Sequence, residues 1–352
     1  MAVRPGESGE VAGVALVEGG DPAWDAFVEA AQDSTFCHAG GWRGITEDVL
    51  GHECTYLAAR NADGDWLGAL PLVRVRSRLF GDYLVSMPFL NYGGPIGSAA
   101  AREHLARHAA HLAERAGIDL LELRCREPVD ADLHLIHRKV AVVLQLPDAA
   151  ETLWSEGFPS KLRSQIRRPM KEGLEARFGP DQVLPFYEVF SRHMRDLGTP
   201  VLPRALFERI ATVFPDASLF GVVYRGEEPV AAGCGLVWRD ELELTWAAAL
   251  REHNRVAPNM LLYWSFMERA IGQGLRAFNF GRSTPGAGTH RFKRQWGGED
   301  VPLPWLQWSA KGMNATPNPD GSRVFQLATR MWQRVPLPLA RRFGPTLARK
   351  LP

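Results

Sequence analysis

The chain of 352 residues is 45% hydrophobic and 23% charged, with a formal net charge of +1. This composition indicates a soluble globular protein, and the near-neutral balance excludes a general electrostatic attraction to nucleic acid, so we expect no DNA partner. The length exceeds what one ordinary core needs and predicts two domains of about 150 residues.

Strand and helix signals follow one another through the first half. Residues 11–18 read as a strand, and Asp21, with Pro22 at the first helical position, begins a helix; a second helix is expected from about His38. Further strands are predicted at 53–60, 65–77 and 83–89, a loop at 91–97, a helix at 99–116 and a strand at 118–125. The first half is therefore expected to be α+β.

The same order recurs in the second half. A strand at 140–147 precedes helical residues 149–173, broken at Pro159 and Pro169. The remaining elements are a strand at 174–178, helices at 183–197 and 204–214, antiparallel strands at 218–225, 229–238 and 241–249, a helix at 258–274 and a strand at 275–280. This recurrence predicts duplicated domains at 1–138 and 139–310, each a mixed, largely antiparallel sheet flanked by helices, and then a basic, apolar tail at 311–352.

The chemistry is expected between residues 279 and 298. Asn279 belongs to a half-buried strand, and the glycines after it allow backbone amides to approach a ligand. The four basic side chains of this segment, which contains no acid, are Arg282, Arg291, Lys293 and Arg294. Because preorganised donors stabilise negative charge, the pattern favours a site for a phosphate or for the oxyanion of acyl transfer. The alternative is a solvated hairpin with ordinary surface arginines.

Four segments carry a resemblance to a known family. They are HRFKRQWGG, WRGITEDVLG, NYGGPIG and the C-terminal WQRVPLPLARRFGPTLARKLP. With the element order, they resemble the FemAB family of tandem GNAT-fold transferases, and most closely the FemAB-like proteins associated with the exosortase and PEP-CTERM systems of exopolysaccharide-producing bacteria. The resemblance spans nearly the whole chain. Its most specific part is Phe292 and Lys293, followed by an aromatic residue and glycines.

This resemblance implies an acyltransferase that moves an acyl or aminoacyl group to an amine on a cell-envelope, polysaccharide or peptidoglycan-related precursor. No metal and no covalently bound cofactor are expected. The donor would be an acyl-CoA-like thioester or an aminoacyl-tRNA, and the acceptor a small molecule or a lipid-linked glycan or peptide. Two alternatives stay open: an aminoacyl-tRNA-dependent peptidyltransferase of the FemX type, and a non-catalytic binding or scaffold protein of an exopolysaccharide export system.

The same resemblance implies roles for residues after the last predicted strand. The lysine that matches Lys293 is implied to place a cation near the donor's phosphate or the developing oxyanion, and Arg291 is its expected catalytic partner. The residues expected to bind donor or substrate beside them are Asn279, Arg282, Ser283, Gly286, Gly288, His290 and Arg294. For Ser283 and Asn279 the alternative is that each closes its own turn. No motif identifies the general base, for which the candidates are His38, Glu47, Glu241 and Glu243.

The segment 251–260, REHNRVAPNM, stands where ordinary GNAT enzymes carry a glycine-rich loop for the coenzyme A pyrophosphate. Asn254 occupies a glycine position and Pro258 removes an amide donor, which disfavours the usual binding of coenzyme A. Arg251 and the helix start at Asn259 remain candidates for binding a phosphate. The best-known aminoacyl-tRNA enzymes of the family carry a coiled-coil insertion, and this sequence has no heptad run.

Two further regions supply candidate contacts. In the loop at 91–97, Asn91 and Tyr92 are expected to contact a sugar or an amine, with Trp42 as a stacking face; a core aromatic in a tight turn is the alternative for Tyr92. The stretch 161–171 is a basic helix that is either a solvated face or a contact for a polyanion such as tRNA. Its candidate contacts are Arg163, Arg167 and Arg168.

After Asp320 the chain has basic residues interleaved with apolar ones and no acid. This pattern in the tail at 321–352 is typical of a segment that rests on an anionic membrane, and the alternative is a tail packed on the second domain. The N-terminus lacks the apolar core of a secretion signal, no apolar run approaches the roughly 20 residues that cross a bilayer, and the four cysteines stand singly. We therefore expect a cytoplasmic protein, peripheral at the inner face of the membrane.

Overall fold

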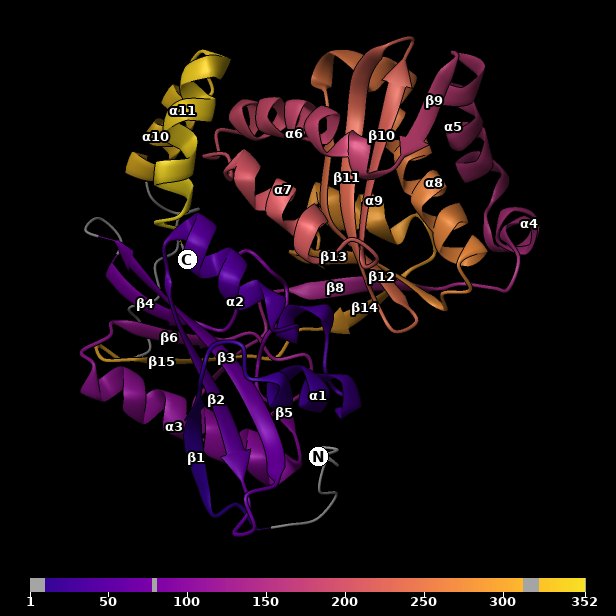
Figure 1. Cartoon of the computed structure of the whole chain (residues 1–352). Coiled ribbons are helices and arrows are strands. Elements are labelled where there is room, and N and C mark those ends of the chain that lie inside the picture. The colour runs from indigo at the N-terminus through magenta and orange to yellow at the C-terminus, as the bar shows by residue number, and fades with distance from the viewer. Residues whose placement is uncertain (1–9, 78–80, 313–322, 352) are drawn as a thin grey trace. The chain divides into compact units, whose positions relative to one another are not determined.

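The computed structural model describes residues 10–77, 81–312 and 323–351. The chain divides into two compact units, each built around one sheet (Figure 1). Unit 1 comprises residues 1–138, 302–318 and 349–352, and unit 2 comprises residues 139–301 and 319–348. The chain thus leaves unit 1 to build the sheet of unit 2, returns to unit 1, and then enters unit 2 again with residues 323–348.

The sheet of unit 1 begins as an antiparallel meander. Its strands are β1 (Gly13–Val17), β2 (Glu53–Arg60), β3 (Trp66–Ser77), β4 (Gly81–Val85), β5 (Ile96–Gly97), β6 (Leu120–Leu123), β7 (His134–Ile136) and β15 (Trp305–Ser309). They lie in the order β1-β2-β3-β4-β6-β15-β7, and β5 pairs with β3. β4 and β6 run parallel. The strand between β6 and β7 therefore comes from the far end of the chain.

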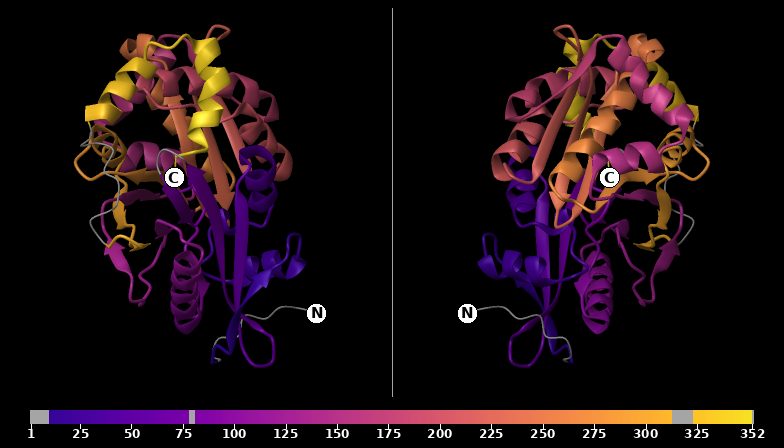
Figure 2. Two further views of the ribbon diagram at one scale, coloured as in Figure 1. Left: turned by 90° about the vertical axis from the view of Figure 1, so that its left-hand side faces the viewer. Right: turned by 90° about the vertical axis from the view of Figure 1, so that its right-hand side faces the viewer.

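Helices cover both faces of this sheet because its strands alternate their side chains. The helical elements are α1 (Pro22–Ala30), η1 (Phe36–His38), α2 (Gly41–Ile45), η2 (Thr46–Leu50) and α3 (Ala99–Arg115). Tyr56 faces Trp24 of α1 at 4.4 Å between ring centroids, whereas the next residue, Leu57, belongs to the core under α3. Figure 2 shows α1 and α3 on opposite sides of the strands.

Unit 2 repeats this plan. Its strands are β8 (Val140–Gln145), β9 (Leu174–Phe178), β10 (Ser218–Arg225), β11 (Glu228–Trp238), β12 (Glu241–Ala249), β13 (Ala277–Ser283) and β14 (Glu299–Pro302). They lie in the order β14-β8-β13-β12-β11-β10-β9. β9 to β12 form an antiparallel meander, and β12 and β13 run parallel, as β4 and β6 do in unit 1.

The helical elements of unit 2 are α4 (Ala150–Thr152), η3 (Leu153–Gly157), α5 (Ser160–Lys171), η4 (Pro180–Gln182), α6 (Val183–Leu197), α7 (Arg204–Val213), η5 (Arg251–Val256), α8 (Pro258–Gly272), α9 (Gly288–Arg294), α10 (Arg323–Trp332) and α11 (Leu337–Ala348). One face of the sheet packs on α6 and α7, where Phe207 lies 5.4 Å from Trp246. The other face packs on α8, whose Phe266 rests on Gly221 and Gly233. A Cβ at Gly233 would come within 2.9 Å of that ring, so these glycines let α8 approach the sheet.

The predicted fold class, two α+β units with mixed, largely antiparallel sheets, is confirmed. Asp21 caps α1 as predicted, since its Oδ1 accepts from the amide of Ala23 at 2.9 Å. The helix expected from His38 is instead three short elements, the last a π-helical turn. The short strands β5, β7, β14 and β15 were not predicted, and β15, expected in the second domain, lies in the sheet of unit 1.

Candidate functional site

The strands β12 and β13 part at one end of their pairing. Their parallel register joins Glu241 to Ala277 and ends where Glu243 meets Asn279, although β12 continues to Ala249 and β13 to Ser283. We call residues 243–249 of β12 and 279–283 of β13 the strand split. Where two strands diverge, their facing backbone groups lose their ladder partners and become available to other groups.

The side chain of Lys293 enters the strand split from α9. Its Nζ donates to the carbonyl oxygens of Gly281 at 3.0 Å and Arg282 at 2.9 Å. Burial lowers the pKa of Lys293 to about 8, the Glu243 carboxylate acts to raise that pKa, and the Arg282 guanidinium lowers it. The site therefore holds a half-buried ammonium group beside a carboxylate that is itself only 8% exposed.

Polar side chains on the two strands fix the base of the split. The hydroxyl of Thr245 donates to Glu243 Oε1 at 3.0 Å. Asn279 is fully buried; its Nδ2 donates to Glu241 Oε1 at 3.0 Å, and its Oδ1 accepts from the amide of Gly281 at 2.8 Å. Asn279, predicted to bind substrate, is thus observed as a strut between β12 and β13. Glu243, a general-base candidate, lies at the split.

The end of β13 adds a hydroxyl and a lysine. Ser283 is 5% exposed, and among the described residues its Oγ finds no hydrogen-bond partner. A buried polar atom without a partner costs about 1–3 kcal/mol, so it marks a place where a ligand or water is accommodated. Next to it, Lys139 Nζ donates to Thr284 Oγ1 at 2.6 Å. The sequence reasoning missed Lys139, which reaches this site because β8 pairs antiparallel with β13.

The other residues predicted to act between residues 279 and 298 form hydrogen bonds within that segment or to Asp300, just beyond it. Arg291 is exposed and donates to the carbonyl of Gly286 at 2.7 Å; Arg294 donates to the carbonyl of Gly298. His290 Nδ1 accepts from the Gly286 amide, and its Nε2 therefore carries the proton toward Asp300 at 2.9 Å. Nothing lies within 4 Å of a Cβ built at Gly286, so the space there is open, and the predicted approach of a ligand stays a prediction.

In unit 1 the parallel strands β4 and β6 correspond to β12 and β13. Among the described residues, backbone and side-chain hydrogen bonds continue beyond the end of their pairing. The parallel register of β4 and β6 ends at Val85 and Glu122, but the amide of Ser86 still donates to the carbonyl of Glu122 at 2.9 Å. Arg124, only 3% exposed, pairs with Glu122 at 2.9 Å and donates to the carbonyls of Met87 and Leu90. A buried ion pair thus occupies in unit 1 the position where unit 2 has Lys293.

The predicted acceptor contacts of unit 1 lie in its core. Trp42 is 3% exposed, and its Nε1 donates to the carbonyl of Phe36 at 3.0 Å; Tyr92 and Asn91 are buried as well. His38 is fully enclosed, and burial lowers its pKa. Its Nδ1 accepts from the Thr35 amide and its Nε2 donates to the carbonyl of Gly94 at 2.8 Å. Tyr92 and His38 also line a small depression of unit 1 with Gly93 and Arg126, and the acceptor contact expected there stays a prediction.

The segment between β12 and α8 forms the helical element η5. The amide of His253 donates to Leu250 and that of Ala257 to Asn254, so these amides are used within the segment. The predicted phosphate contact Arg251 is exposed, whereas Asn259 lies half-buried in the first turn of α8. A pyrophosphate loop needs several amides that point outward, and the internal bonding of η5 does not provide them.

The three arginines predicted to contact a polyanion differ in surroundings. Arg163 NH1 donates to the carbonyls of Trp154, Ser155 and Phe158 and so closes the turn before α5. Arg167 lies over the ring of Trp154 at 5.1 Å. Arg168 is exposed. The contacts of Arg163 hold a turn and Arg168 is open to a ligand, and the polyanion contact of these arginines stays a prediction.

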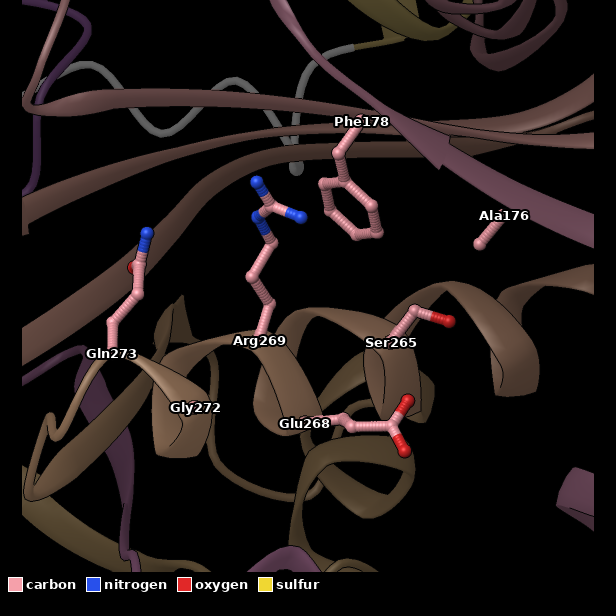
Figure 3. A pocket seen from close by; sticks show the side chains of 7 residues that line it. All are labelled: Ala176, Phe178, Ser265, Glu268, Arg269, Gly272 and Gln273. Carbon is pink, nitrogen blue, oxygen red and sulfur yellow. The ribbon is translucent and has the colours of Figure 1, made fainter.

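Unit 2 also has a depression of about 490 Å³ at its β9 edge (Figure 3). Phe178 points from β9 toward Arg269 of α8, whose guanidinium lies 5.2 Å from the ring centroid. The rest of the lining is Ala176 of β9, Ser265, Glu268 and Gly272 of α8, and Gln273 directly after that helix. Three strands separate β9 from β13 in the sheet order, so this depression is distinct from the strand split. None of its residues was singled out in the sequence.

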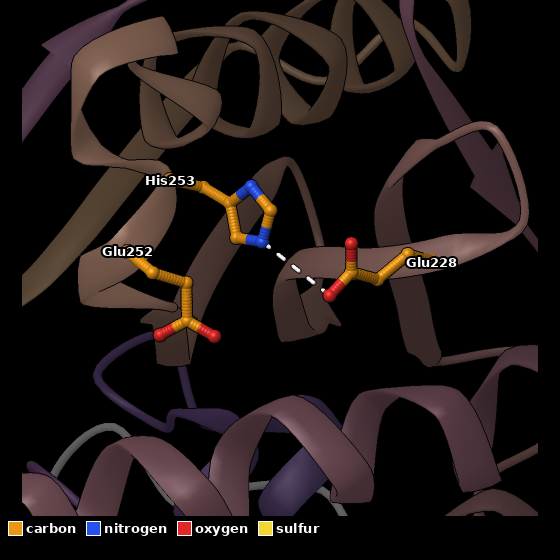
Figure 4. A group of neighbouring side chains, drawn as sticks. All are labelled: Glu228, Glu252 and His253. Carbon is orange, nitrogen blue, oxygen red and sulfur yellow. Dashed lines mark ion pairs between the residues drawn. The ribbon is translucent and has the colours of Figure 1, made fainter.

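One group among the described residues has the composition of a metal site. Glu228, Glu252 and His253 offer ligand atoms within 4.8 Å of one another, and Figure 4 shows the ion pair of His253 with Glu228, at 3.4 Å. Arg192 already neutralises Glu252 at 2.6 Å, which weakens the attraction for a cation. Within the described ranges, no helix is both long and apolar enough to cross a membrane.

Comparison with known proteins agrees with this architecture. Residues 160–294 match the family model described as an acetyltransferase (GNAT) domain. No curated protein matches the chain. Three solved structures cover most of it: FemX (13% identity, 84% of this chain and 97% of that chain, TM-score 0.62), L-PGS from Bacillus licheniformis (14%, 94% and 100%, 0.54) and a tandem GNAT protein from the clavulanic acid biosynthesis pathway (12%, 86% and 99%, 0.51).

At these identities the likeness shows the fold, which is two GNAT-like domains in tandem. With the family match, it supports the predicted transferase enzyme and a FemAB-like tandem GNAT architecture.

Proposed function

We propose that this tandem GNAT-fold chain is an N-acyltransferase that transfers an acyl or aminoacyl group to an amine, and that the strand split of unit 2 is its reaction site. The observation that carries the proposal is the Lys293 ammonium group, held at the parting of β12 and β13 with a pKa lowered to about 8. A cation fixed in a partly dry site stabilises developing negative charge without reorganisation.

The reaction follows from these groups. The acceptor amine attacks the acyl carbonyl and forms a C–N bond, and the negative charge that develops on the carbonyl oxygen is stabilised by Lys293. Collapse of this intermediate breaks the bond to the donor, which leaves as a thiolate or an alkoxide. The proton lost by the amine passes to a carboxylate, for which Glu243 is our candidate because it lies at the same split.

The two units differ in how far the buried cation is neutralised. In unit 1, Arg124 is paired with Glu122 at 2.9 Å and bonded to two carbonyls, whereas Lys293 donates to two carbonyls and forms no ion pair with an acid in the described part of the chain. At the split of unit 2, Ser283 presents a buried hydroxyl with no partner among the described residues. Arg282 and Lys139 then lie beside the bound group, and Asn279 braces β12 against β13. Arg291, Arg294 and His290 hold the backbone that carries Lys293.

An aminoacyl-tRNA is our second candidate for the donor, beside an acyl thioester. The internal hydrogen bonds of η5 argue against a pyrophosphate cradle of the usual kind in unit 2, and this favours a donor without coenzyme A. The likeness to FemX over 84% of the chain points the same way. Arg168, exposed on α5, is then a contact for the tRNA backbone.

The acceptor we propose is an amine on a peptidoglycan- or polysaccharide-related precursor, free or lipid-linked, used in the cytoplasm at the inner face of the membrane. The sequence resemblance to exosortase-associated FemAB-like proteins supports this part, and the likeness to FemX supports a cell-envelope acceptor. A non-catalytic scaffold with the same fold would bind the acceptor and consume no donor.

The test is acceptor-dependent consumption of donor by the full chain. Thiol release is measured with a series of acyl-CoA thioesters, and loss of the amino acid with charged tRNA, each with and without amine acceptors. Lys293→Met should reduce acceptor-dependent transfer at least about 100-fold, whereas Lys311→Met, an exposed lysine of unit 1, should leave it unchanged. Equal transfer by wild type and Lys293→Met would remove Lys293 from the mechanism. Acceptor binding without consumption of any donor would identify the scaffold.

A further inference from the structure

The C-terminal helices are docked on unit 2 by one face only. Ala340, Gly344 and Ala348 of α11 are buried, and a Cβ at Gly344 would come within 3.0 Å of the backbone nitrogen of Val201. Arg341 Nε donates to Ser191 Oγ of α6 at 2.9 Å. Figure 1 shows α10 and α11, in yellow, beside α6. The internal packing of α11 is therefore already provided by its small residues and Arg341.

The face of α11 next to the buried one, one residue or about 100° round the helix, carries an apolar stripe exposed to solvent. Leu339, Phe343 and Leu347 follow the i, i+4, i+8 spacing of one helix face and are 45%, 52% and 42% exposed. α10 repeats the pattern with Leu327 and Met331, which are 59% and 64% exposed. Large apolar side chains exposed together at helical spacing indicate a contact surface.

Basic residues flank both stripes in the same way. Arg330 follows Leu327 by three positions and Arg342 follows Leu339 by three, so each arginine lies beside its apolar stripe. These two arginines and Arg334 are exposed, and they form no ion pair with an acid in the described part of the chain. From residue 321 to the C-terminus the sequence contains no Asp or Glu.

We propose that α10 and α11 form a membrane-docking surface, defined by Leu327, Arg330, Met331, Arg334, Leu339, Arg342, Phe343 and Leu347, which binds an anionic phospholipid bilayer. Charge complementarity selects this occupant. The apolar stripes enter the boundary of the acyl chains, and the arginines on their flanks reach phosphate groups of the lipids. A partner protein would be expected to pair acidic residues with some of these arginines, whereas an anionic bilayer presents a continuous negative surface.

The experiment uses the full chain with sucrose-loaded vesicles, either of phosphatidylcholine alone or of phosphatidylcholine and phosphatidylglycerol in equal parts. We expect pelleting with the anionic vesicles only, and release at high salt, because salt screens the arginine contribution. The double variant Arg330→Glu/Arg342→Glu should weaken binding at least about 25-fold, taking roughly five-fold for each basic residue near the surface. Leu327→Ser/Met331→Ser should weaken it as well.

The matched controls are Arg225→Glu and Leu16→Ser, an exposed arginine and a 69% exposed leucine far from these helices in sequence; both should bind as wild type does. Circular dichroism and a thermal melt confirm that the variants stay folded. Equal pelleting with neutral vesicles, or none with either kind, would overturn the proposal. So would light scattering that shows a dimer broken by Leu327→Ser/Met331→Ser, since the occupant would then be a second copy. No donor or acceptor is present, so this test and that of group transfer succeed or fail separately.

Discussion

The Lys293 ammonium group lies within electrostatic reach of the Glu243 carboxylate, although one belongs to α9 and the other to β12. Burial and the Glu243 carboxylate have opposite effects on the pKa of Lys293. Desolvation lowers this pKa to about 8, and the negative charge of Glu243 keeps it from falling further. A lysine in this state is still mostly charged at neutral pH and loses its proton within the range where enzymes can be assayed.

The first prediction concerns the pH dependence of transfer. If the ammonium form of Lys293 stabilises the oxyanion, kcat should be level at neutral pH and fall as pH rises through about 8. A guanidinium stays charged throughout this range, so any activity left in Lys293→Arg should lack the alkaline fall. A rate that increases through pH 8 would instead make the neutral amine the active form.

Glu243→Gln should lower transfer strongly, because it removes the proposed base, and the transfer that remains should show its alkaline fall at lower pH. The Glu243 carboxylate acts to raise the pKa of Lys293, so an amide in its place lets burial lower that pKa further. The hydrogen bond from Thr245 can still be accepted by the amide oxygen. The measurement is the midpoint of the alkaline limb compared with wild type, and Glu268→Gln, on α8 at the β9 edge, serves as the control. An unchanged midpoint would contradict the coupling.

The same pKa makes a prediction about folding that needs no substrate. Because folding lowers the pKa of Lys293 from 10.5 to about 8, the unfolded chain binds more protons between these two values, and stability must increase as pH rises across that window. Relative to Lys293→Met, which has no such proton, the wild type should gain stability from pH 8 to pH 10. The check is the denaturant midpoint of both proteins at each pH. A difference that does not vary with pH would show that Lys293 titrates normally.

Ser283→Ala should separate stability from binding. Removing a buried hydroxyl that has no partner should leave stability unchanged or raise it by about 1 kcal/mol, and losing its bond to the bound group should weaken substrate binding roughly three- to ten-fold. Ser191→Ala is the contrasting variant, because Ser191 Oγ is bonded to Glu188 and Arg341. The free energy of unfolding of Ser191→Ala should be about 1 kcal/mol lower than that of the wild type, and its KM should be unchanged. Thermal melts and KM values decide between these outcomes.

Gly97→Ala should destabilise unit 1 strongly. Gly97 has φ of +110°, and an added Cβ would lie 2.2 Å from the carbonyl oxygen of Leu67, in the strand with which β5 pairs. We expect a loss of at least about 2 kcal/mol. Gly13→Ala, where nothing lies within 4 Å, should change stability by less than about 0.5 kcal/mol. Urea denaturation of both variants measures the difference.

Local patterns were enough to predict the long elements. β2, β12 and α6 have the predicted bounds because alternation or helical spacing persists over their whole length. β7, β14 and β15 are short, and their existence depends on the partner strand, which no window of sequence reveals. The helix α9 was not predicted, since its basic residues and glycines were read as a turn.

The site shows the same division. The sequence pointed to Lys293 because it follows the last predicted strand in a basic, glycine-rich segment. Its catalytic role remains a prediction. What the sequence did not show is how basic groups are used: Arg291 and Arg163 donate to nearby carbonyls, and Lys139 joins Thr284 through the pairing of β8 with β13. Such assignments depend on the path of the backbone, because carbonyl acceptors are present at every residue.

The place of β15 between β6 and β7 has a consequence for biosynthesis. While the ribosome translates unit 2, the edge of β6, with Leu120, Leu121 and Leu123, stands open, because its hydrogen-bonding partner has not yet been made. At ordinary elongation rates this interval lasts roughly 10 to 40 s, long enough for an open hydrophobic edge to attract chaperones or to aggregate. The sheet of the N-terminal half is thus completed after the sheet of unit 2, and a nascent chain stalled before Trp305 would be a substrate for quality control.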